Sequence, residues 1–227
     1  MTGDTEGLIR RLAEQIEPVR PLSRPWMRAA RWLVLSASYI GVMLLLRSPR
    51  SDLSSELSQP HFLIEQVAAL ATGIAAAAAA FASVVPGHNR RFLALPLLPL
   101  AVWLGSLGQG CVQDWIQLGP QGLSLRPDWF CLRAIAVLGA GPAIAMALML
   151  RRGAPLMPHL TTALGGLAAA GLGDFGLRFV HREDASVMVL VWQFGAVCLL
   201  SALAAGVGRY LLNWRSIAGA DRRGATT

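Results

Sequence analysis

The chain has 227 residues, of which 54% are hydrophobic and 15% are charged, and its net charge is +7. A soluble domain of this length keeps a polar face on each helix, whereas the long apolar stretches of this chain have none. This composition excludes a soluble single-core fold and leaves room for one membrane domain with two tails. We predict an all-α polytopic membrane protein with six transmembrane helices.

The N-terminal tail, residues 1–31, precedes the first apolar stretch. Within it, residues 4–17 (DTEGLIRRLAEQIE) have the pattern of a short amphipathic helix, because Leu8, Leu12 and Ile16 recur every four residues. Water-exposed helices of fewer than about 12–15 residues are marginally stable alone, so this apolar stripe needs a partner. The prolines of the following PVRPLSRP segment favour an extended connection to the membrane.

Six apolar stretches then follow, each close to the ~20 residues that a ~30 Å hydrocarbon layer requires. The predicted spans are Trp32–Leu46, His61–Val85, Phe92–Gln113, Trp129–Leu150, Leu156–Val180 and Val187–Leu212. The membrane domain therefore covers residues 32–212, and residues 213–227 form a basic C-terminal tail. The first span is short, so we expect it to include Met27–Arg31, with Arg28 and Arg31 reaching the interface.

Small residues in two spans predict close helix packing. They are Ala75–Ala80 in the second span and Gly165, Gly166, Gly171, Gly173 and Gly176 in the fifth.

The basic residues predict the orientation of the chain. All twenty are arginine, and fourteen fall on one face: thirteen in the two tails and the loops after the second and fourth spans, and Arg209 near the end of the sixth span. Five lie toward the opposite face, and Arg133 lies inside a span. The positive-inside rule then places both termini in the cytosol. This distribution attributes the basic charge to membrane orientation rather than to direct contact with nucleic acid.

Four ionisable residues lie inside or at the ends of predicted spans, and all fall in the half of the membrane away from the termini. They are Glu65, Arg133, Asp174 and Arg178. A charge there costs about 2.5–3.5 kcal/mol on insertion scales, so we expect an intramembrane charge network. The alternative is a small transporter or channel subunit that uses Glu65, Arg133 and Asp174 as a relay, although the chain lacks the internal repeats of many transporters.

Two cysteines, Cys111 and Cys131, fall near the same outer face, whereas Cys198 lies in the middle of the sixth span. The first two are candidate signal-sensing thiols, and the alternatives are a structural disulfide or inert packing. The chain has no CxxC, no HExxH and no histidine pair at ligand spacing, so we expect no metal and no cofactor. It also has no phosphate-binding loop and no nucleophile beside a base, so we expect no enzyme activity.

Several blocks of the sequence resemble one family. The tail DTEGLIRRLAEQIEPVRPL, followed by RRGAPLMP, TTALGGLAAAGLGDFGLRFVHREDAS, VLVWQFG and GRYLLNW, is similar to the NrsF-type membrane anti-sigma factors. The resemblance implies an anti-sigma factor that sequesters an extracytoplasmic-function sigma factor at the bacterial inner membrane. Release would follow an envelope stress signal, such as redox or heavy-metal stress. The implied sigma-binding residues are Leu8, Ile9, Leu12, Ile16, Pro18, Val19 and Leu22.

The family also carries two signal-linked cysteines. Cys131 matches the one near the start of the fourth span, but the second, which follows a histidine after the fifth span, is replaced here by Arg182 after His181. Cys111 is a candidate substitute because it lies on the same face. A further alternative for residues 4–17 is a membrane-surface anchor of a scaffold protein, although the acids on its polar face weaken attraction to anionic lipid.

Overall fold

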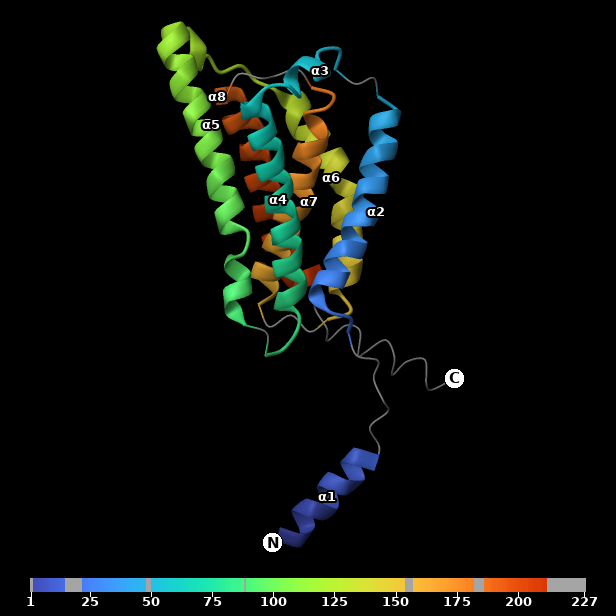
Figure 1. Ribbon diagram of the computed structural model, residues 1–227. Helices are drawn as coiled ribbons and strands as arrows, with labels where there is room; N and C mark the ends of the chain where they lie inside the picture. Colours follow the sequence, from blue (N-terminus) through green and yellow to red (C-terminus); the bar gives the residue numbers. More distant parts are fainter. Residues whose placement is uncertain are drawn as a thin grey trace.

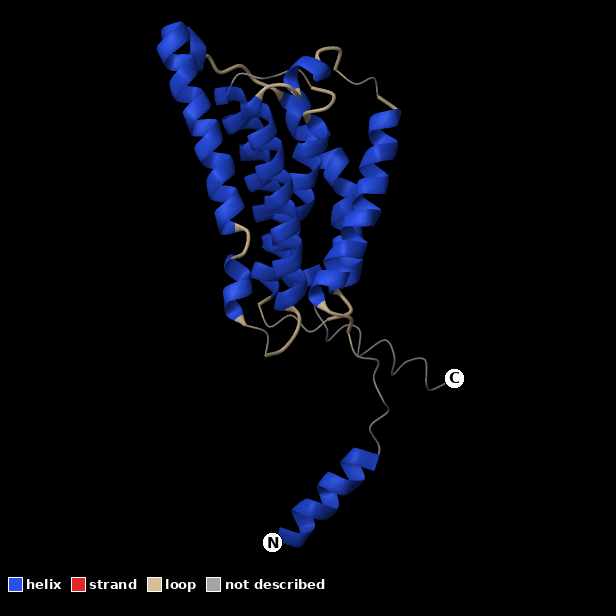
Figure 2. Cartoon of the chain, in the orientation of Figure 1, coloured by secondary structure: helices blue, strands red, loops and turns tan. Residues whose placement is uncertain are grey.

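The computed structural model describes residues 2–14, 22–47, 50–87, 89–153, 157–181 and 186–211. Within these stretches all regular structure is helical, which confirms the predicted all-α class. Figure 2 shows helices joined by loops, and no strand, in the described part of the chain. The first helix, α1 (Thr2–Glu14), lies away from the others, which together form a bundle (Figure 1).

The bundle contains the six predicted spans, since six described helical runs are long and apolar enough to cross a membrane. They are α2 (Pro25–Leu45), α4 (Pro60–Ser83), α5 (Leu97–Leu118), α6 (Trp129–Leu150), α7 (Pro158–Leu177), and the continuous run of α8 (Ser186–Met188), the π-helical η3 (Val189–Phe194) and α9 (Gly195–Leu211). Shorter elements lie in the connections: α3 (Leu53–Glu56), η1 (Arg90–Ala94) and η2 (Gly119–Leu123).

Successive spans run in alternating directions (Figure 1). We call the end of the bundle at which α2 begins the proximal end, and the opposite end the distal end. Because the number of crossings is even, α9 ends at the proximal end, where α2 begins. The segments before α2 and after α9 therefore join the bundle at the same end.

Two spans extend by several residues beyond their predicted bounds. The first begins at Pro25 rather than Trp32, so α2 includes Met27–Arg31, as expected, and also residues 25–26 of the predicted tail. Proline is favoured at the first position of a helix because its missing N–H would have no partner there. Cys111, predicted to end the third span, lies within α5, which continues to Leu118.

Helix α7 lies at the centre of the bundle, where it packs against α4, α6 and α9. The small residues of α7 allow this close packing, as predicted. A Cβ atom on Gly173 would lie 2.8 Å from the carbonyl oxygen of Ile135 in α6, and one on Gly139 would lie 3.1 Å from the carbonyl oxygen of Ala169. The alanine run of α4 is buried on the other side of α7. Close backbone contact thus replaces large side chains at the core of the bundle.

Candidate functional site

Helix α1 presents an apolar stripe that the other described residues do not cover. Leu8, Ile9 and Leu12 are 55%, 60% and 54% exposed, and the helix lies clear of the bundle (Figure 1). Leu22, just before α2, is also exposed. The other predicted binding residues, Ile16, Pro18 and Val19, lie outside the described part of the chain.

Helix α2, which connects the N-terminal segment to the bundle, is held to α6 by three side-chain donors. Arg28 donates to the carbonyl oxygen of Met149 at 2.5 Å and Trp32 donates to that of Pro142 at 2.9 Å. The hydroxyl of Tyr39 donates the third hydrogen bond, to the carbonyl oxygen of Val137 at 2.9 Å. Hydrogen bonds between membrane helices contribute about 0.6 kcal/mol on average, with some near 1.7 kcal/mol. Together they fix α2 along most of its length.

The position of Arg28 corrects the expectation that its side chain reaches the interface. Arg28 is only 4% exposed, and its guanidinium lies 4.7 Å from the ring centre of Phe81. Met149 lies in the last turn of α6, where carbonyl groups lack intrahelical donors and a cation is favoured by the helix dipole. The Arg28 side chain therefore supplies a hydrogen-bond donor to a carbonyl group at the end of α6, inside the protein. Arg31 is exposed, in agreement with the expectation.

Sequence reasoning did not predict that Arg28, Trp32 and Tyr39 join α2 to α6, although their spacing contains a signal. Arg28, Trp32 and Ser36 recur every four residues, Tyr39 follows three residues later, and the first three are buried on one face of α2. Polar-tipped residues aligned in this way on a membrane span indicate an interhelical face.

A buried group of ionisable side chains lies in the distal half of the bundle. We call His61, Glu65, Asp174 and Arg178 the distal charge cluster. The guanidinium of Arg178 donates to Glu65 Oε2 at 3.2 Å and stacks on the ring of Phe62 at 5.0 Å. Glu65 Oε1 lies 3.0 Å from His61 Nε2. Glu65 and Arg178 are both about 95% buried, so each charge depends on the other for compensation.

Asp174 lies one turn before Arg178 on α7 and is 2% exposed. Its Oδ1 atom makes no hydrogen bond to any described residue. Burying a carboxyl oxygen without a donor is costly, so the described residues leave the polar burial of Asp174 only partly compensated.

Arg133 does not join this cluster, contrary to the predicted four-residue network. Its side chain is exposed, and its Nε atom donates to the carbonyl oxygen of Trp129 one turn earlier in α6. The predicted relay of Glu65, Arg133 and Asp174 therefore lacks its arginine link in this structure. Glu65 pairs instead with Arg178.

The three cysteines are present as thiols. Cys131 is fully buried in the core at the start of α6, Cys111 is partly buried on α5, and Cys198 is exposed on the bundle surface. The alternative of a disulfide between Cys111 and Cys131 is not realised in this state. Their predicted role in sensing stays a prediction, and for Cys131 it requires that the core open to admit a reagent.

Asp128 connects the start of α6 to the end of α7. Its Oδ1 atom accepts a hydrogen bond from the backbone N–H of Cys131 at 3.1 Å, which caps the helix, and its Oδ2 atom lies 2.8 Å from His181 Nε2. The ring of Phe130 lies 5.2 Å from the His181 ring. Arg182, which follows, lies outside the described residues. The histidine that precedes the family's second cysteine position thus contacts the helix cap that holds Cys131.

Comparison with known proteins identifies one family. The family model NrsF, described as a negative regulator of sigma F, matches residues 12–214, which is most of the chain. No curated protein and no solved structure matches the chain.

Proposed function

Because the chain belongs to the NrsF family of negative regulators of sigma F, we propose that it is a membrane-bound anti-sigma factor that holds an extracytoplasmic-function sigma factor through α1. The observation that carries this proposal is the uncovered stripe of Leu8, Ile9 and Leu12 on a helix too short to be stable alone. A groove on a sigma factor would cover this stripe by helix-in-groove recognition.

The size of the stripe indicates how far the binding surface extends. Covering three half-exposed aliphatic side chains contributes on the order of 1 kcal/mol each. A micromolar complex needs about 8 kcal/mol after the cost of association. The three described residues are too few, so the proposed surface continues through the remaining predicted residues, which are Ile16, Pro18, Val19 and Leu22.

The proposal places the chain in the bacterial inner membrane with both termini in the cytosol. Two features support this orientation: the arginine excess in the tails and proximal loops, and the joining of both terminal segments to the proximal end of the bundle. A reporter enzyme that is active only in the cytosol, fused before residue 1 of the full chain, tests the orientation. Activity of a periplasm-specific reporter at the same position would contradict it.

We further propose that envelope stress, including redox or heavy-metal stress, acts on the distal half and releases the sigma factor. The distal charge cluster supports this because it contains a buried carboxylate oxygen without a donor, and Cys111 and Cys131 are the candidate thiols in the same half. Helix α2 would transmit the change to the N-terminal segment. A tenfold loss of affinity requires only about 1.4 kcal/mol of coupling, comparable to one or two of the hydrogen bonds between α2 and α6.

Co-purification of the full-length protein with each extracytoplasmic-function sigma factor of its host tests the proposal. We expect Leu12→Asp to abolish recovery of the cognate sigma factor and to raise transcription from its promoters. Arg10→Asp is the matched control, because it introduces the same side chain on the opposite face of α1. Equal recovery with wild type and Leu12→Asp would refute this docking surface.

A small transporter or channel subunit remains the second candidate, favoured by the buried Asp174 and Glu65. Ion flux in proteoliposomes that is lost on Asp174→Asn would support it. Absence of flux, combined with sigma factor capture, would leave the anti-sigma function.

A further inference from the structure

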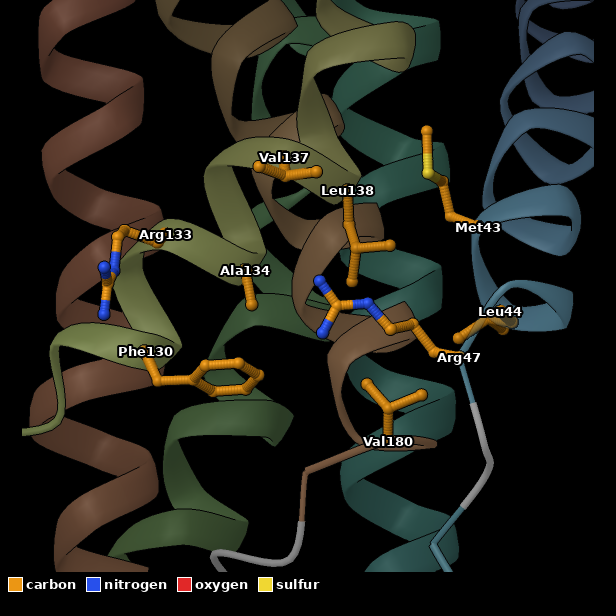
Figure 3. Close-up of a pocket in the computed structure, with 9 residues that line it drawn as sticks. All are labelled: Met43, Leu44, Arg47, Phe130, Arg133, Ala134, Val137, Leu138 and Val180. Atoms are coloured by element: carbon orange, nitrogen blue, oxygen red, sulfur yellow. The ribbon is translucent and has the colours of Figure 1, made fainter.

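A cavity of about 340 Å³ opens at the distal end between α2 and α6, beside the end of α7 (Figure 3). This volume lies at the lower end of the range for small-molecule sites in proteins. It lies outside the distal charge cluster and shares no residue with it. The cavity is therefore a separate feature of the molecule.

The cavity combines an apolar lining with two arginines. Apart from Arg47 and Arg133, its lining side chains are apolar. Val137 and Phe130 in this lining are 54% and 41% exposed, so the cavity opens to the outer surface of the bundle rather than to its core. In a membrane that surface contacts lipid, so acyl chains have direct access to it.

Arg47 differs from Arg50 and Arg178, the two described distal arginines that pair with carboxylates. Arg50 is bound by Asp52 at 2.8 Å, and Arg178 by Glu65 at 3.2 Å. Among the described residues, no carboxylate lies within ion-pair distance of Arg47, whose guanidinium extends from α2 toward α6 across the cavity (Figure 3). Arg47 is exposed, so its guanidinium is accessible to an anionic headgroup at the edge of the membrane.

We propose that this cavity binds an anionic phospholipid of the distal leaflet. The phosphate of the lipid pairs with Arg47, and Arg133 at the opposite edge adds a second positive charge. The first part of an acyl chain fills the apolar space against Leu44, Ala134 and Val137. The source of the anion is a lipid rather than a soluble phosphate, because apolar surface makes up most of the lining and faces the bilayer.

This site lies between the two helices that Trp32 and Tyr39 join by hydrogen bonds. A bound lipid contacts both helices at their distal ends. Lipid binding can be measured directly, so the test of this site does not depend on sigma factor recognition.

Native mass spectrometry of the full-length protein in detergent, equilibrated with equal amounts of phosphatidylglycerol and phosphatidylcholine, tests the proposal. We expect wild type to retain phosphatidylglycerol preferentially, and Arg47→Gln to weaken that retention roughly fivefold. Arg47→Lys, which keeps the charge, should retain most of the preference. Arg126→Gln is the matched control, because it removes an exposed distal arginine outside the cavity.

A second pair of variants tests the cavity itself. Ala134→Phe fills the apolar space while leaving both arginines, and should reduce phosphatidylglycerol retention. Ala143→Phe makes the same substitution at an exposed position of α6 outside the cavity and should leave retention unchanged. Equal retention of the two lipids by wild type, or retention unaffected by Arg47→Gln, would overturn the proposal. Glycerol phosphate binding as tightly as the intact lipid would overturn the assignment to a lipid.

Discussion

The indole Nε1 of Trp32 donates a hydrogen bond to the carbonyl oxygen of Pro142, at a point where Trp32 is fully buried. The bond joins α2, which follows the N-terminal segment, to α6. Helix α6 lines the distal cavity and carries the buried Cys131. Any change that separates α2 from α6 must break it. The bond therefore contributes to holding α2 against the helix that lines the distal cavity.

Trp32→Phe should destabilise the protein by about 1 kcal/mol, because it removes the donor while keeping an aromatic ring in the core. The free energy of unfolding can be measured by titration with sodium dodecyl sulfate. Trp26→Phe is the control, since Trp26 is 61% exposed and should leave the free energy unchanged. Equal stability of the two variants would show that the bond does not hold α2.

Arg178→Met should destabilise the protein by about 3–5 kcal/mol, because it leaves the buried Glu65 without its counter-charge. Adding Glu65→Gln to that variant should restore part of the loss, since the uncompensated charge is then removed. The same unfolding titration measures wild type, both single variants and the double variant. Strictly additive losses would contradict a coupled pair.

Gly173→Ala should destabilise the bundle by about 1–3 kcal/mol, because the added Cβ would lie 2.8 Å from the backbone oxygen of Ile135 and neither helix can yield without repacking. Gly105→Ala is the matched control, as nothing lies within 4 Å of its added Cβ. Thermal unfolding in detergent compares the two. A Gly173→Ala variant as stable as the control would refute the close contact of α6 and α7.

A single-cysteine protein that keeps only Cys131 should resist maleimide labelling in mild detergent and react fully after denaturation, because the thiol is buried in the core. A protein that keeps only Cys198 should react readily in detergent, since that residue is exposed. Mass spectrometry of the labelled proteins gives both extents. Rapid labelling of Cys131 in the folded protein would indicate that the core opens without a signal.

Much of the architecture follows from local features of the sequence. The length and apolar character of the spans predict six crossings, because each helix must satisfy its own backbone within the membrane. The glycines of α7 predict close contacts, and Gly173 makes one. The spacing of Leu8, Ile9 and Leu12 predicts a helical stripe, and α1 presents these residues together.

Contacts between spans could not be predicted in the same way. Arg28 and Arg133 have similar positions near the ends of apolar stretches, yet Arg28 is buried against α6 and Arg133 is exposed. The pairing of Glu65 with Arg178, and the position of Arg47 over a cavity, likewise depend on which helices are neighbours.

The sequence by itself determined that this chain has six helices long and apolar enough to cross a membrane, and a further helix with an apolar stripe. Only the tertiary structure decided which charges pair, which helix holds α2 and where a cavity remains. The physical reason is that a span such as α6 is apolar on all sides. Any rotation of the helix about its axis therefore presents an apolar surface to the lipid. Its rotation is set by specific contacts, such as the one between Trp32 and Pro142, that exist only once the helices have packed.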